Sequence, residues 1–235
     1  MTFIDVRPDR QPGLKALANR VAAPEPSSGE PAASATPVEE SRARRQDIRR
    51  AAAQMIAERG VLKATMQGVG RAVKLRGSSL YHYYATREAL FAEIMLEHLH
   101  ALGLKVCAAF DATETAGPRQ RLEAMIAAFL DAALAERNEH RLTLRSGDVL
   151  NEDKRHAVRV RTRSLVDLFG EVLALAVPDA APAAVQVAAM SLVAAMSCAA
   201  LWFHQDGEVA VADYARMLAL MAMSGAAADP GAGIP

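Results

Sequence analysis

Cysteine, aromatic residues and net charge are all scarce in this chain of 235 residues, and each scarcity excludes a class of protein. Two cysteines, Cys107 and Cys198, are too few for a disulfide framework or a multi-cysteine zinc site. Aromatic residues amount to 5%, and no segment alternates between apolar and polar residues, which favours an all-α fold. No apolar run follows Met1, so we expect no secretory signal and a cytoplasmic location.

The net charge of zero conceals an uneven distribution along the chain. Residues 41–90 carry 11 Lys and Arg against 3 Asp and Glu, a net charge of +8, whereas residues 1–40 sum to −2 and residues 91–235 to −6. A basic block of this size in a neutral chain is expected where phosphate groups are bound. A solvated basic surface without a partner is the alternative interpretation.

The first 40 residues predict a disordered leader, because they hold six prolines and show no apolar period. From residue 41 onward, apolar residues follow helical spacing, and three short helices are predicted before about residue 90. Thr65 and Thr86 are well placed to cap two of these helices. The arrangement is typical of a helix-turn-helix domain, which we assign to residues 41–90.

Residues 91–225 predict a second helical domain, followed by a flexible tail at 226–235. Within it, the stretch 187–203 is apolar on nearly every side and approaches the length of a membrane span. No basic cluster flanks the stretch, so we expect no membrane contact and instead a helix covered at a subunit interface. A central helix in the core of a monomer remains the alternative.

The segment from Gly60 to Leu90 resembles the DNA-binding domain of the TetR family of transcriptional regulators. The matching positions are Gly60, Thr65, Val69-Gly70, Leu75, Ser79, the run Leu-Tyr-His-Tyr-Tyr at 80–84 and the run Thr-Arg-Glu-Ala-Leu at 86–90. The resemblance implies a ligand-responsive regulator, a repressor that binds double-stranded operator DNA as a homodimer and is released by a small-molecule effector.

The candidate DNA-binding residues lie around the third short helix of this domain. A recognition helix needs a small, polar first turn, where free N–H groups also favour phosphate. Tyrosine, histidine and arginine side chains beyond that turn carry donors for backbone phosphates. The set comprises Arg45, Thr65, Arg76, Gly77, Ser78, Ser79, Tyr81, His82 and Arg87. Packing with a wet hydroxyl is the alternative for Tyr81, and simple exposure is the alternative for His82.

Four residues depart from the family pattern, and one of them, Ser78, sits where glycine or alanine is usual. Lys74 occupies the turn position that usually holds glycine, where a left-handed backbone costs a lysine roughly 1 kcal/mol. Arg76 replaces a usual capping Ser or Thr and supplies a long bidentate donor instead. Tyr84 replaces the usual phenylalanine, which is benign if its hydroxyl reaches water.

By the same resemblance, a cavity among the helices after residue 90 binds the effector. The candidate lining residues are Phe110, Met125, Phe129, Phe169, Met190, Trp202 and Phe203. Residues at such helical spacing more often form a plain core, which is the alternative interpretation for each of them. Four polar candidates would recognise an acidic or acyl ligand, with a solvated surface as the alternative: Arg141, Arg145, Arg163 and His204.

Motifs of catalysis are missing from the sequence. It contains no phosphate-binding loop, nucleotide fingerprint or His-Glu-x-x-His motif, so we expect no enzymatic activity, no cofactor and no metal. The alternative function is a helical small-molecule-binding or scaffold protein that no longer reads DNA specifically. Lys74 and Arg76 are the departures that support it.

Overall fold

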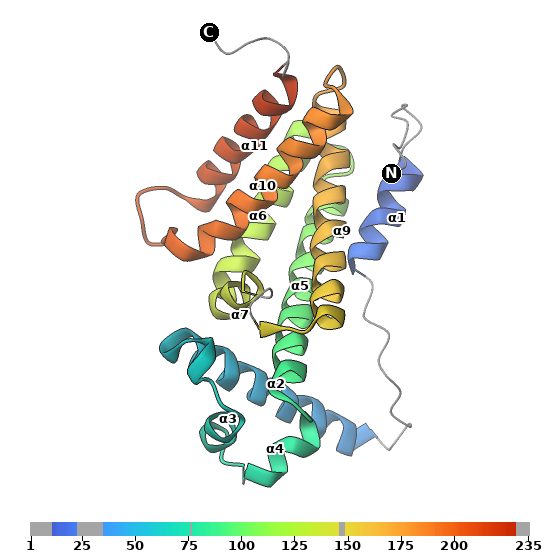
Figure 1. Cartoon of the computed structure of the whole chain (residues 1–235). Coiled ribbons are helices and arrows are strands. Elements are labelled where there is room, and N and C mark those ends of the chain that lie inside the picture. The colour runs from blue at the N-terminus through green and yellow to red at the C-terminus, as the bar shows by residue number, and fades with distance from the viewer. Residues whose placement is uncertain (1–10, 23–34, 76, 146–148, 229–235) are drawn as a thin grey trace. The chain divides into compact units, whose positions relative to one another are not determined.

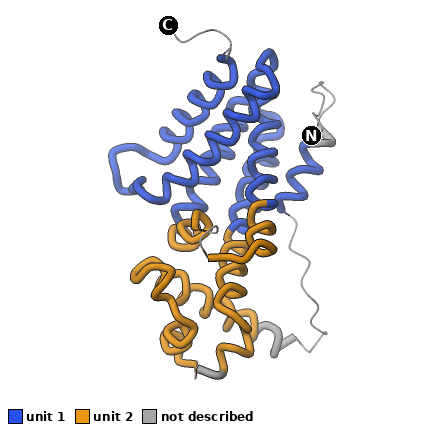
Figure 2. The backbone as a smooth tube through the Cα atoms, in the orientation of Figure 1, with its two compact units in different colours: residues 1–23, 99–135, 160–235 blue, residues 24–98, 136–159 orange. Residues whose placement is uncertain are grey.

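A computed structural model of the protein describes residues 11–22, 35–75, 77–145 and 149–228 (Figure 1). Every regular element in these ranges is a helix, which confirms the all-α prediction. The chain forms two compact units that do not follow the order of the sequence (Figure 2). The head unit comprises residues 24–98 and 136–159, and the core unit comprises residues 1–23, 99–135 and 160–235.

The head unit contains the predicted helix-turn-helix. Its elements are α2 (Ala35–Arg59), η1 (Val61–Lys63), α3 (Met66–Ala72), α4 (Gly77–Tyr83), the first part of α5 (Arg87–Ala112), α7 (Arg137–Thr143) and the start of α9 (Glu152–Ala176). Both predicted caps are confirmed: Thr65 Oγ1 accepts a hydrogen bond from Gly68 N, and Thr86 Oγ1 accepts one from Ala89 N, each at 3.1 Å. These bonds satisfy N–H groups that have no partner within the helices.

The turn between α3 and α4 closes despite its lysine. Leu75 N donates to Gly70 O at 2.8 Å and Lys74 N donates to Arg71 O at 3.1 Å, which is the hydrogen-bond pattern of a Schellman motif. Lys74 has φ 57°, the left-handed conformation expected from the sequence. The protein therefore keeps the turn geometry and bears the strain of a non-glycine residue there.

The core unit is built around α6 (Pro118–Ala135), α10 (Pro182–Trp202) and α11 (Val211–Ala227), which pack against one another. Apolar side chains at helical spacing on α6 are fully buried: Leu122, Met125, Ile126, Phe129, Leu130 and Ala133. Among the described residues, α10 is the helix long and apolar enough to cross a membrane. Core helices of soluble proteins meet the same criterion, so this is weak evidence for a span.

The prediction of a disordered leader is wrong for part of its length. Residues 11–22 form α1 (Gln11–Ala22), and α2 begins at Ala35 rather than near residue 41. Leu14, Leu17, Ala18 and Val21 follow i, i+3, i+4 and i+7 spacing on α1 and are all buried in the core unit. The neighbouring prolines concealed this short stripe. The predictions for residues 1–10, 23–34 and 229–235 lie outside the described residues.

Candidate nucleic-acid interface

Helix α4 exposes the side chains expected to meet DNA and buries those expected to pack. Tyr81 is 52% exposed and His82 is exposed, whereas Leu80 and Tyr84 are buried against the head unit. Ser79 is half-buried. The alternation follows from helical geometry, because residues three to four apart share a face.

The remaining predicted residues lie at the borders of this helix. Thr65 is exposed and acts as the cap of α3, and Arg87 is half-buried with its guanidinium carbon 5.6 Å from the centre of the Phe91 ring. The placement of Arg76 and the side chains of Gly77 and Ser78 lie outside the described residues. The backbone nevertheless starts α4 at Gly77, where the small first turn was predicted.

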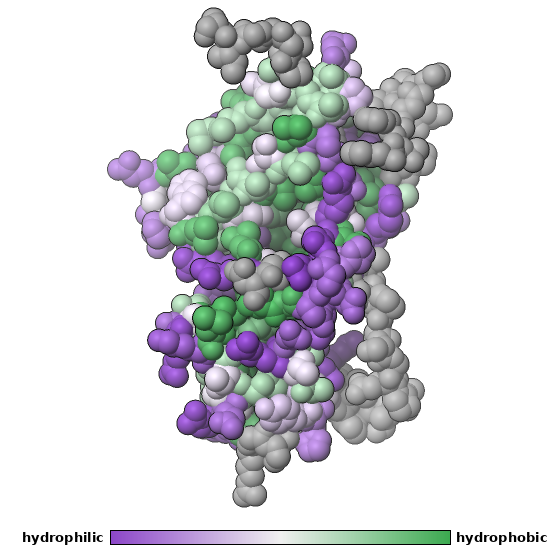
Figure 3. Space-filling view, in the orientation of Figure 1, coloured by the Kyte–Doolittle hydropathy of each residue, from purple (hydrophilic) through white to green (hydrophobic). Residues whose placement is uncertain are grey.

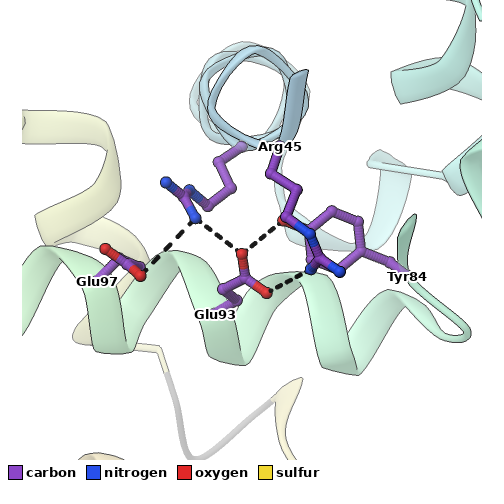
Figure 4. Close-up of polar contacts among 5 residues, drawn as sticks. Arg45, Tyr84, Glu93 and Glu97 are labelled. Atoms are coloured by element: carbon purple, nitrogen blue, oxygen red, sulfur yellow. Dashed lines mark hydrogen bonds and ion pairs between the residues drawn. The ribbon is translucent and has the colours of Figure 1, made fainter. Parts of the chain in front are cut away.

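A carboxylate on α5 binds two arginines of α2 and the tyrosine that follows α4 (Figure 4). Glu93 accepts hydrogen bonds from the Tyr84 hydroxyl at 2.7 Å, from Arg49 Nη1 at 2.8 Å and from Arg45 Nη1 at 3.3 Å. The Arg45 guanidinium also lies 5.3 Å from the centre of the Tyr84 ring. The Glu93 network thus joins α2 and α5 to Tyr84, the residue that follows α4.

The Glu93 network holds two residues that the sequence analysis singled out, Tyr84 and Arg45. The Tyr84 hydroxyl does not reach water but donates to Glu93, since its ring is buried with only 3% of the residue exposed. Burial, reinforced by the negative charge of Glu93, raises the pKa of Tyr84 well above its usual range. Arg45 directs its donor to Glu93 within the head unit. Sequence reasoning missed Glu93, which carries no motif of its own.

A second buried polar cluster joins α5 to α7 and was also missed. His98 Nε2 and His140 Nδ1 are 2.8 Å apart, and His98 Nδ1 lies 2.9 Å from a Glu136 carboxylate oxygen. Each histidine is 2% exposed. Helical spacing from Leu90 and Ile94 places His98 on the buried face of α5, which is the signal that could have identified it. Among the described residues, no group of three or more His, Cys, Asp or Glu side chains is placed to hold a metal ion.

Most of the predicted effector-lining residues lie inside the core unit. Phe110, Met125, Phe129, Phe169 and Phe203 are at most 4% exposed. The Phe129 and Phe169 rings meet edge to face at a centroid distance of 6.2 Å. Trp202 and Met190 differ, because 55% and 50% of these residues are exposed on α10. The four polar candidates, Arg141, Arg145, Arg163 and His204, are all exposed.

An apolar groove lies between α10 and α11, away from those aromatic residues. It has a volume of about 470 Å³ and is lined mainly by alanines together with Val187, Leu192, Leu218 and Met221. Figure 3 shows apolar side chains gathered over these two helices. Val187 and Met221 are 63% and 62% exposed. Exposed apolar surface of this kind marks a place of contact with another molecule.

Two family models match this chain. The model of bacterial regulatory proteins of the TetR family matches residues 48–94, and the model of the tetracyclin repressor-like C-terminal domain matches residues 115–226. The first range covers α3, α4 and, of the Glu93 network, Arg49, Tyr84 and Glu93, and the second covers α6, α10 and all but the last residue of α11. No curated protein matches the chain.

Solved structures share the fold. A TetR-family regulator from Bordetella parapertussis is 24% identical, with a TM-score of 0.69 over 77% of this chain and 94% of its own. PfmR from Thermus thermophilus is 21% identical, with a TM-score of 0.66 over 76% of this chain and 97% of its own.

AibR, solved with isovaleryl coenzyme A and operator DNA, is 22% identical, with a TM-score of 0.66 over 76% of this chain and 97% of its own. The family models thus cover both the helix-turn-helix and the helices of the core unit. With its exposed recognition helix, capped turns and helical second domain, the chain belongs to the TetR family of transcriptional regulators.

Proposed function

We propose that this TetR-family regulator is a repressor that binds operator DNA as a homodimer and releases it when a small-molecule effector binds the core unit. The observation that carries the proposal is the exposed outer face of α4, with Tyr81 and His82 free of the packing that buries Leu80 and Tyr84. An exposed polar face on a rigidly held short helix is what major-groove reading requires.

On DNA, we propose that one set of residues positions the protein on the phosphate backbone and another set recognises the base sequence. Tyr81, His82 and Arg87 donate to phosphates, while Arg76 and the small residues at the start of α4 approach base edges. We assign Arg45 to holding Tyr84 through Glu93, because Arg45 Nη1 donates to that carboxylate at 3.3 Å. The turn between α3 and α4 keeps both of its backbone hydrogen bonds although lysine replaces the usual glycine at position 74. This intact turn supports specific DNA binding over a scaffold role.

The groove between α10 and α11 is the proposed dimer interface. A second copy that presents the same two helices would cover Val187, Met217 and Met221, which are at least 50% exposed in the single chain. A two-fold axis there presents the recognition helices as a symmetric pair, which matches the symmetry of a palindromic operator.

The effector is proposed to bind among the aromatic residues of the core unit. Phe110, Phe129 and Phe169 are closely packed in the described structure, so binding requires them to part. AibR was solved with both an acyl coenzyme A and operator DNA, which supports the same two classes of partner here. The protein acts in the cytoplasm, where the DNA and the effector meet.

Selection of binding sites from random duplexes with the purified protein tests this function. A palindromic consensus is expected. Arg87→Ala should weaken binding to all duplexes and lower the slope of log affinity against log salt by about one. The matched control is Arg163→Ala, which removes the same charge from an exposed ion pair with Asp167 in the core unit. Recovery of no preferred duplex, or an equal effect of both variants, would reject the assignment.

A further inference from the structure

Helix α1 lies on a face of the core unit that two other helices provide. On α5, Gly103 leaves room for Val21, and the Cys107 thiol donates to the α1 backbone at 3.3 Å. On α9, Arg161 Nη1 donates to the Val21 carbonyl at 3.2 Å. All of these residues belong to the core unit, and Figure 1 shows α1 beside α9. We call the face formed by Gly103, Cys107 and Arg161 the α1 seat.

Two buried donors of the α1 seat are directed at oxygen atoms of α1. Arg161 is 8% exposed and Cys107 is 6% exposed, and their acceptors are the carbonyls of Val21 and Ala18. A buried guanidinium that loses an acceptor leaves a costly N–H group behind. If α1 leaves, the seat therefore favours an occupant that returns an oxygen to Arg161, and a carboxylate is the strongest acceptor of this kind.

The remainder of the contact is apolar and already filled. Leu14, Leu17, Ala18 and Val21 share one buried face of α1. At the N-terminal end of this face, the hollow that Leu14 and Phe110 border has a volume of about 10 Å³, which is hardly room for one water molecule. A ligand can therefore use this apolar surface only by displacing α1.

Helix α1 is suited to displacement. Its twelve residues make a marginal helix in water, so α1 depends on its docking and regains conformational freedom when it leaves. Its ion pair between Lys15 and Glu114 joins side chains that are 56% and 54% exposed, which adds little. The segment also precedes both ranges that the family models match, residues 48–94 and 115–226.

We propose that the α1 seat is a ligand site for a carboxylate with an extended apolar chain, and that such a ligand enters by displacing α1. The carboxylate takes the hydrogen bond that Arg161 now makes to Val21. The apolar chain takes the place of the buried face of α1 and points toward Phe110, one of the residues proposed to line the effector site. The inference rests on the proposed function only in identifying this ligand with the effector.

Competition between α1 and the ligand has a sign that binding measurements can detect. The ligand binds only molecules with undocked α1, so its apparent dissociation constant equals the intrinsic one divided by the undocked fraction. A substitution that loosens α1 without altering the seat must therefore tighten ligand binding. Loss of an ordinary binding residue has the opposite effect. By linkage, the ligand must favour undocked α1.

Hydrogen exchange of the wild-type protein is the first test, because the amides of α1 are protected only while it is docked. The probe is sodium decanoate, and the control is 1-decanol, which carries the same chain length without the carboxylate. Saturating decanoate should speed exchange across residues 14–22 about tenfold, and 1-decanol should have a much smaller effect. Unchanged exchange with decanoate bound, or no decanoate binding by calorimetry, would overturn the proposal.

Leu17→Asp loosens α1, because it places a carboxylate on the buried face of the helix at a residue that is 7% exposed. Ala16→Asp is the matched control, since it makes the same change at the exposed neighbouring position. In calorimetry, Leu17→Asp should bind decanoate about tenfold more tightly than the wild-type protein, and Ala16→Asp should bind it with wild-type affinity. Equal or weaker binding by Leu17→Asp would place the decanoate elsewhere and overturn the proposal.

Arg161→Gln tests the chemical class of the ligand. In the Leu17→Asp background, it should weaken decanoate binding about tenfold and leave 1-decanol binding unchanged, because only the carboxylate needs the guanidinium. Arg163→Gln removes the same charge from an exposed position of α9 and should change neither. An equal loss of both ligands with Arg161→Gln would show that Arg161 acts through the fold of α9, which would refute the carboxylate.

The duplex selected by the wild-type protein decides whether the ligand of the α1 seat is the effector. Decanoate should weaken binding of this duplex several-fold. If decanoate speeds α1 exchange and leaves DNA affinity unaltered, the ligand site stands and its identity with the effector site is refuted. If no duplex is selected, the proposed function fails, while exchange and calorimetry still decide the site.

Discussion

The head unit and the core unit are stabilised by different kinds of contact. In the head, single polar atoms hold the helices: Glu93 accepts from three side chains, and His98 joins α5 to α7 through His140 and Glu136. In the core, α6, α10 and α11 pack against one another, and their buried side chains, Met125 and Phe129 among them, are mostly apolar. A hydrogen bond is directional and apolar contact is not. Directional hydrogen bonds therefore fix the positions of the helices in the head, while the apolar side chains of the core can repack.

Each kind of contact suits the function proposed for its unit. A recognition helix must present its donors at fixed positions, and directional contacts at its flanks provide that. A domain that admits a small molecule must open its packing at modest cost, and apolar side chains part without leaving unpaired polar groups behind. The predictions below act on one or the other kind of contact.

The largest effect is expected where apolar contact is proposed to extend between chains. Ala195 lines the groove of α10 and α11, and Ala195→Asp would place an unpaired carboxylate inside the proposed interface, at a cost of about 3–5 kcal/mol. Sedimentation velocity should show a wild-type dimer and a folded variant monomer at micromolar concentration. Ala108→Asp, at an exposed position of α5, should remain dimeric. A well-folded wild-type monomer would remove the interface from the proposal.

Disrupting the Glu93 network should have a smaller energetic effect than Ala195→Asp, but it should alter the specificity of DNA binding. Glu93→Gln removes the charge that holds Arg45 and Arg49, and we expect the free energy of unfolding to fall by about 1–3 kcal/mol. Released arginines should raise affinity for nonspecific DNA, while a loosened Tyr84 lowers affinity for the selected duplex. Competition binding measures the ratio of the two affinities.

Glu97→Gln is the matched control for this variant, one turn further along α5. Its carboxylate is 3.9 Å from Arg49 and its side chain is 56% exposed, so its loss should change neither stability nor specificity measurably. An equal effect of the two substitutions would mean that general charge, rather than the Glu93 network, sets the behaviour of the head.

The buried thiol of the core unit predicts a pH effect of defined sign. Burial raises the pKa of Cys107 from 9.0 to about 11, so between these values the folded state retains a proton that the unfolded state releases. Stability should be constant below about pH 9, fall toward pH 11 and level off above it. Urea unfolding from pH 8 to 10.5 measures the effect. In the Cys198→Ser background, Cys107→Ala should show a weaker decline, and an identical decline would refute the shift.

The smallest effect concerns the strained turn of the head. Lys74→Gly relieves a positive φ of 57° and should raise stability by up to about 1 kcal/mol. Arg71→Gly, at an exposed site inside α3, should lower stability by a similar amount, because glycine there disfavours the helix. Thermal unfolding distinguishes the two. A destabilised Lys74→Gly would mean that the lysine side chain makes a contribution larger than the backbone strain.

Local chemistry explains why much of the head was predictable. The caps at Thr65 and Thr86 and the left-handed turn at Lys74 each involve residues at most five apart in the chain, so spacing alone indicates them. Glu93 was missed because its partners Arg45 and Arg49 are more than 40 residues away. A glutamate on a helix surface carries no local sign of such partners.

The same distinction between local and distant contacts applies to two helices of the core unit, α6 and α1. On α6, the helical periodicity of the apolar residues indicates which face is buried, and Phe129 and Met125 on that face are buried. On α1 the stripe is only four residues long, and what stabilises it is Gly103, Cys107 and Arg161, which lie at least 80 residues further along the chain. Helix class, caps and the family motif follow from interactions within a few residues and can be read from order alone. The Glu93 network and the seating of α1 depend on which distant groups the folded chain brings within bonding distance, so only the tertiary structure could decide them.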